Sequence, residues 1–451
     1  MNIYKPETIK TWLQHLDIEK LNPMQEALLA AVAEHPEVVL LSNTGSGKTL
    51  AFLLSILRDI DPEQKETQSL VIVPSRELAL QIDSVFRKMG TGLKLTTCYG
   101  GHKREIEEMN LIEAPALIIG TAGRLSDHIR RKNIKTESIR FLVMDEFDKL
   151  MELGFEEEMT FIVRSLPALQ YKLLTSATTP ESYPDFVKLQ SPVVVNFRVD
   201  GDEASNAALE IMCLQSDEKD KIETLFSLLC YADNKPCIVF CNHRESVERV
   251  SKWLREKGLR TAFYHGGMEQ RERESEMCMF RNGTSTILVT TDLASRGLDI
   301  PGIRYIVHYH LPMDESVFTH RNGRTARMHD FGTAVLLLGP DEVAPAFIQE
   351  EMKAMAVPEN LPVPPRTQWT TLHFSLGKKE KVNKIDIVGF LSQRAGLKKD
   401  DIGMIEVKDH YSFAAVRRNR ASDTLRLVKD DKLKNKKVKI GIATMMTDSL
   451  P

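Results

Sequence analysis

A short glycine-rich stretch that ends in Lys-Thr has the residue types and spacing to hold phosphate groups. It reads Ser42-Asn43-Thr44-Gly45-Ser46-Gly47-Lys48-Thr49, between the apolar run 38–41 and a helix-like stretch over 50–57. A tight turn between a strand and a helix directs backbone N–H groups inward, where the Lys48 ammonium can meet the outer phosphates and the Thr49 hydroxyl can ligate magnesium. The general pattern has glycine where this chain has Ser42, and a small serine is tolerated there. We expect a phosphate-binding loop; a glycine turn that binds nothing is the weaker alternative.

Carboxylates follow the apolar run 141–144, in the sequence Asp145-Glu146-Phe147-Asp148. Parallel sheets place their ligands at the carboxyl ends of the strands, where these side chains are expected. Asp145 is suited to hold a magnesium ion, usually through its water shell, and Glu146 to orient and deprotonate an attacking water. On this stretch alone, an acidic turn that caps the next helix is an equally good interpretation.

Two arginines much later in the chain could complete such a site. They belong to His320-Arg321-Asn322-Gly323-Arg324-Thr325-Ala326-Arg327. If this stretch is helical, His320, Arg324 and Arg327 share one face, because they are four and three residues apart. Arginines so placed can reach a γ-phosphate across a cleft. A surface arginine cluster is the alternative.

The elements that must position these residues show the same alternation of strand-like and helix-like stretches in two successive parts of the chain. Short runs of Val, Ile and Leu alternate with helix-like stretches, first at 70–73, 116–119, 141–144, 172–174 and 193–195, then at 237–241, 261–264, 286–289, 305–308 and 333–338. The alternation predicts two tandem α/β domains, each a parallel sheet wrapped by helices. We expect them over 1–200 and 208–355, joined by a polar linker at 199–207.

A third domain follows a proline-rich linker at 356–369. Its pattern predicts, in order, a strand at 371–376, a helix at 384–395 closed by Gly396, strands at 403–407 and 412–416, a helix at 419–429 and a strand at 437–442. The order β-α-β-β-α-β is a ferredoxin-like or RNA-recognition layout. We expect an RRM-like α+β domain over 370–446.

Length and composition favour a multidomain protein with reduced cysteines that is neither secreted nor inserted in a membrane. The length of 451 residues suggests about three domains, and the six cysteines lack paired CxxC spacing, which favours reduced, buried thiols over a zinc site or disulfides. The first ten residues lack the apolar centre of a secretory signal, and no apolar run approaches membrane-spanning length, so we expect a cytoplasmic protein that does not enter a membrane.

The net charge of −3 conceals an asymmetry. Residues 366–451 carry 19 Lys and Arg against 10 Asp and Glu, a net charge of +9, which leaves −12 for the rest of the chain. Neutralising phosphates supplies affinity that does not depend on sequence, so a basic C-terminal piece indicates a polyanionic partner. A solvated lysine-rich surface is the alternative.

In their order, the motifs resemble those of the DEAD-box RNA helicases of superfamily 2, over roughly residues 1–350. In the terms of that family, Gln25 closes the adenine-reading Q motif, and motifs I, II, III, V and VI are 42–49, 145–148, Ser176-Ala177-Thr178, 290–299 and 320–327. The resemblance implies two RecA-like domains, with ATP and Mg²⁺ as the bound cofactors. It also implies that Gly297 and Asp299 of motif V approach the nucleotide.

The resemblance further implies that a series of motifs follows the sugar-phosphate backbone of RNA. The residues concerned are Pro74, Arg76, Gly100, Gly101, Thr121, Gly123, Arg124, Asn242, Gln270, Arg273, Thr291 and Asp292. Two departures from the family pattern stand out. Phe147 occupies the third position of motif II, which is least tied to chemistry, so hydrolysis should remain. In the Q motif, Leu21-Asn22-Pro23-Met24-Gln25 replaces Pro-Thr-x-Ile-Gln, and Tyr4 is the nearest aromatic that could stack on adenine.

The C-terminal piece is similar to the RNA-binding domain of the DbpA group, bacterial helicases directed to ribosomal RNA. The stretches that carry this likeness are 386–391, 401–407 and 411–416. Only Tyr411 and Phe413 could stack bases, and either can be core. We therefore expect binding through the basic residues Lys378, Lys379, Lys381, Arg417, Arg418 and the 432–439 cluster with Lys437. The resemblance implies a hairpin of large-subunit ribosomal RNA near the peptidyl transferase centre, in a pre-ribosomal particle, as the partner.

The sequence thus predicts a monomeric RNA-dependent ATPase that locally separates short RNA duplexes during assembly of the large ribosomal subunit. Lys48, Asp145 and Glu146 lie in the first domain and Arg324 and Arg327 in the second, so hydrolysis requires closure of the two domains. RNA that spans both domains favours the same closure, and the coupling of RNA and ATP is then reciprocal. An ATP-gated RNA-binding clamp or assembly factor without productive unwinding remains open, whereas the motif set disfavours a DNA translocase.

Overall fold

The structure is a computed structural model that describes residues 5–42, 45–101, 103–179, 183–197, 209–292, 302–323, 325, 332–429 and 431–443. The described residues up to 197 belong to one compact unit and those from 209 onwards to a second. The expected linker at 199–207 lies outside the described residues. No helix among the described residues is both long and apolar enough to cross a membrane.

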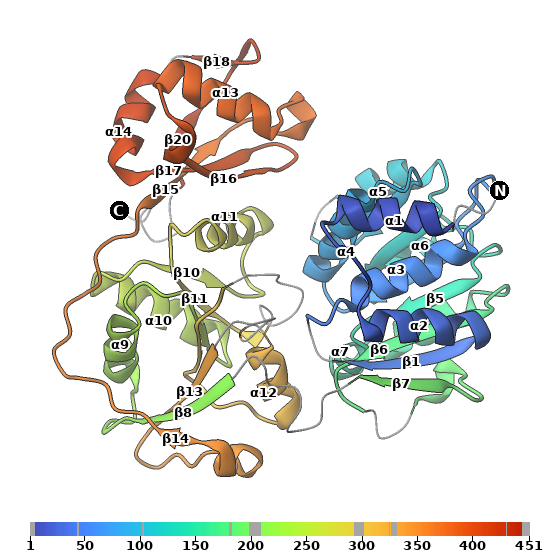
Figure 1. The fold of residues 1–451 in the computed structure, drawn as a ribbon, viewed down its shortest axis with the longest axis horizontal. Coiled ribbons are helices and arrows are strands. Elements are labelled where there is room, and N and C mark those ends of the chain that lie inside the picture. Colours follow the sequence, from blue (N-terminus) through green and yellow to red (C-terminus); the bar gives the residue numbers. More distant parts are fainter. Residues whose placement is uncertain are drawn as a thin grey trace. The chain divides into compact units, whose positions relative to one another are not determined.

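The first unit is one parallel sheet between two layers of helices (Figure 1). Its strands follow the order β3-β4-β2-β5-β6-β1-β7, with bounds β1 Glu37–Ser42, β2 Ser69–Val73, β3 Leu95–Cys98, β4 Leu117–Thr121, β5 Phe141–Met144, β6 Tyr171–Ser176 and β7 Val193–Phe197. Its helices are α1 Pro6–His15, α2 Pro23–Glu34, α3 Lys48–Asp59, α4 Arg76–Met89, α5 Arg104–Leu111, α6 Ala122–Arg130, α7 Phe147–Glu152 and α8 Glu156–Arg164, with the short 3₁₀ helix η1 Asp185–Val187.

Consecutive strand residues of this sheet belong to two separate cores. Val38 and Leu40 pack with α1 to α4, whereas Val39 and Leu41 pack with the helices of the opposite face. Side chains alternate along a strand, so a sheet covered on both faces needs apolar residues at every position. This double burial explains the continuous apolar runs in the sequence.

The second unit contains another parallel sheet, ordered β10-β11-β9-β12-β13-β8-β14. Its strands are β8 Leu209–Gln215, β9 Cys237–Phe240, β10 Thr261–Tyr264, β11 Ile287–Thr290, β12 Tyr305–His308, β13 Gly332–Leu338 and β14 Lys353–Ala354. Its helices are α9 Ile222–Tyr231, α10 Arg244–Glu256, α11 Gln270–Arg281 and α12 Glu315–Asn322, with the 3₁₀ helix η3 Ala346–Glu351. Residues of β13 again alternate between two cores, Val335 and Leu337 on one face, Ala334 and Leu336 on the other.

The C-terminal part of this unit is an antiparallel sheet with two helices on one face. The sheet order is β16-β17-β15-β20, with bounds β15 Trp369–Phe374, β16 Ile402–Val407, β17 Ser412–Arg417 and β20 Ile440–Ile442. The helices are α13 Lys384–Ala395 and α14 Arg418–Leu427, and the 3₁₀ turns are η4 Lys378–Glu380 and η5 Lys399–Asp401. Gly396 closes α13 in the left-handed conformation, φ +65°, as the sequence predicts.

The expected fold class, two RecA-like parallel sheets and an RRM-like α+β domain, is confirmed. The predicted strand at 437–442 is wrong in part. Lys436–Lys437 form strand β19, which pairs with β18, Lys432–Leu433, in a separate hairpin, and only 440–442 join the sheet. The two residues between β18 and β19, Lys434 and Asn435, both have positive φ, which makes the two-residue turn of a tight hairpin. Strands β3 and β8 were not among the predicted strands, since Leu95–Cys98 and Leu209–Gln215 mix polar residues with apolar ones.

Candidate active site

The glycine-rich loop joins the carboxyl end of a strand to the start of a helix, since Ser42 ends β1 and Lys48 begins α3. Gly45 and Gly47 have φ values of +82° and +89°, in the left-handed region that favours glycine. Within the turn the Ser42 hydroxyl donates to Ser46 Oγ at 2.8 Å, and Lys48 Nζ donates to the Ser42 carbonyl at 3.0 Å. The ammonium is therefore held at the amino end of a helix, where backbone N–H groups favour an anion.

Gln25 is tied to this loop. It forms a capping box with Asn22 at the start of α2: Gln25 N donates to Asn22 Oδ1 and Asn22 N to Gln25 Oε1, both at 2.9 Å. Gln25 Nε2 also donates to the Gly47 carbonyl at 3.2 Å, and Asn22 Nδ2 to the Ser46 carbonyl at 2.9 Å. An amide has two N–H donors and two lone pairs, so these bonds leave one of each for a ligand. Gln25 thus couples the start of α2 to the phosphate loop.

The two adjacent carboxylates lie at the carboxyl end of β5. Glu146 has φ +52°, an uncommon value for a residue with a Cβ, and its N–H donates to Asp145 Oδ1 at 3.1 Å and to Thr175 Oγ1 at 3.2 Å. Thr175 in turn donates to Asp145 Oδ1 at 2.5 Å. Strained backbone of this kind persists where surrounding bonds hold it, and it concentrates at functional sites.

The electrostatics of Asp145 suit a cation. Burial raises the pKa of its carboxyl, and the charge of Lys48 and the Thr175 hydrogen bond oppose that rise. Keeping this carboxylate ionised therefore costs free energy that a bound cation would offset. Together with the Thr49 hydroxyl, the site offers the oxygen donors that Mg²⁺ prefers.

Asp148 connects two motifs that lie about thirty residues apart. Its Oδ2 accepts hydrogen bonds from Ala177 N and Thr178 N, both at 3.3 Å, and from Thr178 Oγ1 at 3.1 Å. Ser176 Oγ donates to the Thr178 carbonyl at 2.6 Å, which holds the turn after β6 in place. The carboxyl ends of β5 and β6, adjacent in the sheet, are therefore bonded to each other.

Three more of the expected segments meet at the carboxyl ends of β2, β3 and β4. Arg76 Nη1 donates to the Gly100 carbonyl at 3.5 Å, and its guanidinium lies 5.8 Å from the centre of the Tyr99 ring. Gly101 has φ +92°, and a Cβ there would lie 2.6 Å from Arg76 Nη1. Pro74 precedes α4, and Thr121 and Gly123 stand at the end of β4 and the start of α6.

Glu107 holds this region together, although the sequence did not single it out. Its buried carboxylate accepts from Tyr99 N at 2.8 Å, lies 2.8 Å from Arg124 Nη1 and accepts from His128 Nε2 at 2.7 Å. Cys98, Glu107 and His128 offer three possible metal-ligand atoms within 4.8 Å of one another. Arg124 already neutralises the carboxylate, and burial raises the pKa of Cys98 so that the thiol keeps its proton, so we interpret the group as an ion-pair cluster.

In the second sheet, buried Arg321 binds two of the expected residues. Its Nε and Nη2 lie 2.6 and 3.0 Å from Asp292 Oδ1 and Oδ2, and Nη2 donates to Asn242 Oδ1 at 2.9 Å. A bidentate pair of this kind is strong and directional. Asn242 and Asp292 are therefore held by a residue that the sequence interpretation named only as part of its motif.

Comparison with known proteins now decides the family. Residues 22–186 match the model of the DEAD/DEAH box helicase, residues 220–329 the helicase conserved C-terminal domain, and residues 371–442 the DbpA RNA binding domain. The chain is 33% identical to the ATP-dependent RNA helicase DbpA of Escherichia coli over 98% of both chains. It is 27% identical to the protein of the same name from Bacillus subtilis over 96% of both.

The chain belongs to the DEAD-box RNA helicases. It is an ATP-dependent RNA helicase of that type. Among solved structures it is similar to S. cerevisiae Dbp5 bound to RNA and ADP BeF3, with a TM-score of 0.67 and 26% identity over 78% of this chain and 93% of the other. Mss116p bound to ssRNA and AMP-PNP shares the fold, with a TM-score of 0.68 and 23% identity over 79% of each chain.

Several expected site residues of this helicase lie outside the described residues: Tyr4, Asn43, Thr44, Gly297, Asp299, Arg324 and Arg327. Helix α12 ends at Asn322, and Thr325 pairs with Ile303 in a β-bridge. The face that His320 would share with Arg324 and Arg327 stays a prediction, because those two arginines are not among the described residues.

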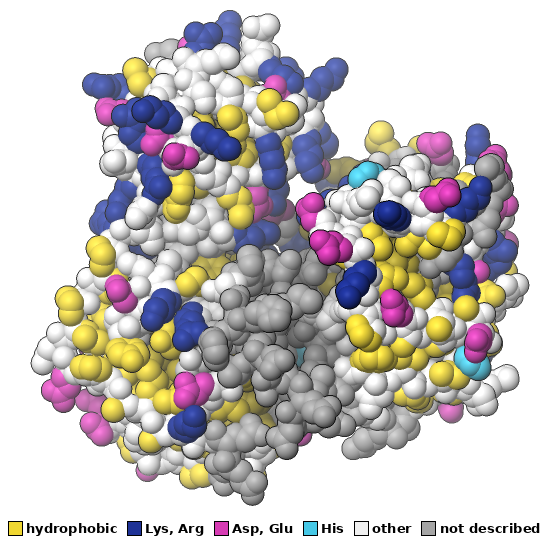
Figure 2. All heavy atoms as spheres, viewed as in Figure 1, with side chains coloured by type: hydrophobic (Ala, Val, Ile, Leu, Met, Phe, Trp, Pro, Cys, Tyr) yellow, Lys and Arg dark blue, Asp and Glu magenta, His cyan; other side chains and the backbone are white. Residues whose placement is uncertain are grey.

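In the helicase's C-terminal domain, some of the expected basic residues are exposed to solvent, whereas others contact neighbouring residues of the protein. Lys378, Lys379 and Lys437 are exposed, and Lys and Arg gather on this domain's surface in Figure 2. Arg417 stacks on the Trp369 ring at 4.6 Å and bonds to Gln368, and Arg418 donates to the Arg366 carbonyl. These two arginines brace the start of the domain.

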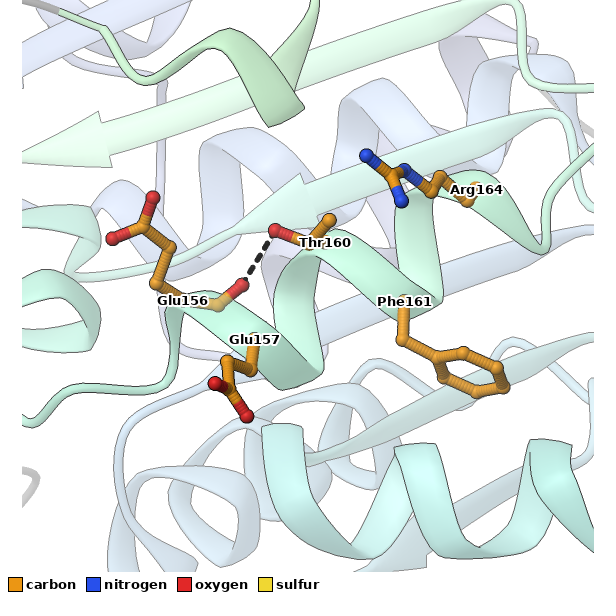
Figure 3. Close-up of a pocket in the computed structure, with 5 residues that line it drawn as sticks. All are labelled: Glu156, Glu157, Thr160, Phe161 and Arg164. Atoms are coloured by element: carbon orange, nitrogen blue, oxygen red, sulfur yellow. Dashed lines mark hydrogen bonds between the residues drawn. The ribbon is translucent and has the colours of Figure 1, made fainter.

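A surface hollow of about 510 Å³ lies on helix α8, lined by Glu156, Glu157, Thr160, Phe161 and Arg164 (Figure 3). Its lining comes from one helix, and the Thr160 hydroxyl turns back to its own helix by donating to the Glu156 carbonyl at 2.7 Å. None of the expected site residues lines this hollow.

Proposed function

We propose that this helicase is an RNA-stimulated ATPase that separates short RNA duplexes locally, on large-subunit ribosomal RNA during ribosome assembly. The observation that carries this proposal is the likeness to the DbpA helicases over 98% of the chain, which includes the C-terminal domain as well as both sheets. A chain that matched only the helicase core would offer no reason to choose this RNA.

In the first unit, Lys48 binds the outer phosphates of ATP, and Gln25 reads the adenine with the donor and acceptor that its other bonds leave. Asp145 and Thr49 hold Mg²⁺, which neutralises charge on the phosphates when it is bound. Glu146 orients and deprotonates the attacking water. Its fixed backbone, bonded to Asp145 and Thr175, keeps this carboxylate in one place.

The second unit completes the chemistry. Arg324 and Arg327 stabilise the charge that develops on the γ-phosphate, while Gly297 and Asp299 approach the nucleotide. RNA that contacts both units favours the same closed state as ATP, so each ligand tightens the binding of the other. The clusters around Arg76, Glu107 and Arg124 and around Arg321 keep the RNA-contacting turns of each unit in register.

The C-terminal domain supplies the target. Several of its exposed lysines belong to the turn η4 and the hairpin β18–β19. These are Lys378, Lys379, Lys381, Lys432, Lys434, Lys436 and Lys437, called the basic edge below. The hairpin β18–β19 and the turn η4 adjoin there, because Lys434 Nζ donates to the Lys381 carbonyl at 2.7 Å. This edge suits the phosphates of a folded RNA hairpin.

A strand-displacement assay tests the function. Wild type should hydrolyse ATP faster with RNA than with DNA of the same sequence, and should release a short RNA strand. Glu146→Gln should bind RNA and ATP but release no strand. If wild type consumes ATP and frees no strand, the protein is an ATP-gated RNA clamp; if DNA alone stimulates hydrolysis, it is a DNA translocase.

A further inference from the structure

The sheet of the C-terminal domain has two faces, and its own helices cover only one. Leu372 of β15 and Ala414 of β17 belong to the core that this sheet shares with α13 and α14. Side chains alternate along a strand, so Phe413 points to the opposite face. There it packs with Cys278 and Met279 of helix α11, and it is 1% exposed. The second RecA-like domain therefore covers the face that stacks bases in RNA-recognition domains.

Polar contacts surround this apolar centre. Thr371 Oγ1 accepts from Asn282 Nδ2 at 2.7 Å and lies 2.8 Å from Thr284 Oγ1. Arg281 Nε lies 3.4 Å from Glu406 Oε1. Against the desolvation of its burial, Arg281 and Lys408 hold the pKa of Glu406 below its usual value. Buried hydrogen bonds and an ion pair around packed side chains indicate a fixed interface.

A chain of hydrogen bonds runs from this interface to Gln270, the first residue of α11. Tyr411 Oη donates to Glu274 Oε2 at 2.9 Å, and Gln270 Nε2 donates to Glu274 Oε1 at 2.6 Å. Burial and the Glu274 carboxylate raise the pKa of Tyr411, so its hydroxyl keeps the proton that it donates. A carboxylate only accepts hydrogen bonds, so Glu274 also fixes which way the Gln270 amide is turned.

This orientation leaves one polar atom of Gln270 unsatisfied. Among the described residues, its Oε1 is buried and has no hydrogen-bond partner. A buried acceptor without a donor destabilises the protein, and such an atom in a native protein calls for an explanation. The Gln270 residue as a whole is only partly buried, so a ligand that displaces the atoms covering Oε1 and brings a donor would satisfy it.

The chemistry of the donor follows from the proposed function, on which this step rests. Phosphate oxygens accept hydrogen bonds and cannot satisfy an amide oxygen. The ribose 2′-hydroxyl can donate, and it is the group that distinguishes RNA from DNA. We propose that Tyr411 and Glu274 are positioning residues that hold Gln270 so that its Oε1 accepts a hydrogen bond from a ribose 2′-hydroxyl. The C-terminal domain thereby contributes to RNA selection in the helicase core, apart from its own target.

The hydrogen bonds from Tyr411 through Glu274 to Gln270 are called the relay below. The variant Tyr411→Phe tests the relay, because it removes one hydroxyl and keeps the ring. The measurement is the concentration of oligouridylate that half-saturates ATPase stimulation, compared with oligodeoxyuridylate and with 2′-O-methyl oligouridylate, which lacks the donor. Tyr411→Phe should raise the value for oligouridylate about threefold to tenfold and change the two others less than twofold. Tyr231→Phe, the same change at an exposed position of α9, is the matched control and should change none of them.

A double-mutant cycle separates positioning from a merely structural role. In a Gln270→Ala background Tyr411→Phe should have no further effect on the oligouridylate value, whereas independent effects would multiply. Glu274→Gln, which lets the Gln270 amide turn over, should act in the same direction as Tyr411→Phe. An equal loss for all three oligonucleotides, or no loss, overturns the relay. If wild type is not stimulated by RNA at all, the proposed function fails first, so the two failures are distinguishable.

Discussion

The Glu107 carboxylate lies 2.8 Å from the guanidinium of Arg124, and its other oxygen accepts a hydrogen bond from the backbone of Tyr99. One buried side chain thus bonds to the turn after β3 and to the first turn of α6, which follows the neighbouring strand β4. Both turns belong to the RNA-contacting motifs of the proposed function. Their separation is therefore set by a residue that need not touch RNA.

Glu107→Gln should weaken RNA binding more than ATP binding. The substitution keeps the shape but removes the buried negative charge that faces Arg124, which costs on the order of 3 kcal/mol of stability. We expect the RNA concentration for half-maximal ATPase stimulation to rise about fivefold or more, with the KM for ATP nearly unchanged. Glu108→Gln is the matched control, because Glu108 pairs at the surface with Arg104. Equal effects of both variants would contradict the role of Glu107.

Lys48→Ala should abolish ATP hydrolysis. Without the ammonium, charge on the outer phosphates loses its partner at the start of α3, and a loss of roughly a hundredfold or more is expected. The control is Lys172→Ala, since Lys172 pairs with Glu37 near the amino end of its strand, away from the loop. Steady-state ATPase rates with saturating RNA measure both variants. Near-normal turnover of folded Lys48→Ala would overturn the assignment of the loop.

The second RecA-like domain should lose stability in mild acid. His308 is fully buried, and burial followed by the charge of Arg321 lowers its pKa from 6.5 to about 3. Between these values the unfolded chain binds one more proton than the folded chain, so the stability conferred by neutral His308 is complete above pH 6.5 and falls as the pH drops towards 3. The expected slope is about 1.4 kcal/mol per pH unit.

Urea unfolding at pH 7.5, 6.0 and 5.0 measures this slope. The variant His308→Gln should reduce the pH dependence by about one proton, although its stability at pH 7.5 is lower because the hydrogen bond to Asn322 changes. His35→Gln, at an exposed position of the first unit, should leave the slope unchanged. A wild-type slope that His308→Gln does not alter would contradict the prediction.

Reversing charge on the basic edge should reduce affinity for ribosomal RNA. In Lys378→Glu/Lys379→Glu/Lys437→Glu, the dependence of log affinity on log salt should become shallower by about two to three. Each of the three lost phosphate contacts contributes about 0.7 on a single strand and about 0.9 on a duplex. Lys398→Glu/Lys399→Glu changes exposed lysines at η5 of the same domain and serves as the control. An identical loss in the control would show that net charge alone attracts the RNA.

These substitutions are a better test of targeting than removal of residues 366–451. Truncation would uncover the apolar side chains Cys278 and Met279 on α11 and would remove Tyr411 from Glu274. A change in RNA binding could then come from the helicase core. The charge reversals leave that interface intact.

Sequence patterns alone predicted the fold class and the family correctly, and they also pointed to the residues of the candidate nucleotide site. Local patterns suffice for these, because a glycine-rich turn between a strand and a helix, or carboxylates after a buried strand, act through near neighbours in the chain. The continuous apolar runs of β1 and β5 likewise required sheets covered on both faces.

The side chains that hold these motifs in place can be recognised only in the folded protein. Glu107 meets Arg124, Asp148 meets Thr178 and Tyr411 meets Glu274 across separations of 17, 30 and 137 residues, and a single glutamate or tyrosine has no periodic pattern that would mark it. Hydrogen bonds between distant residues form only after the chain has folded, so no local pattern records them.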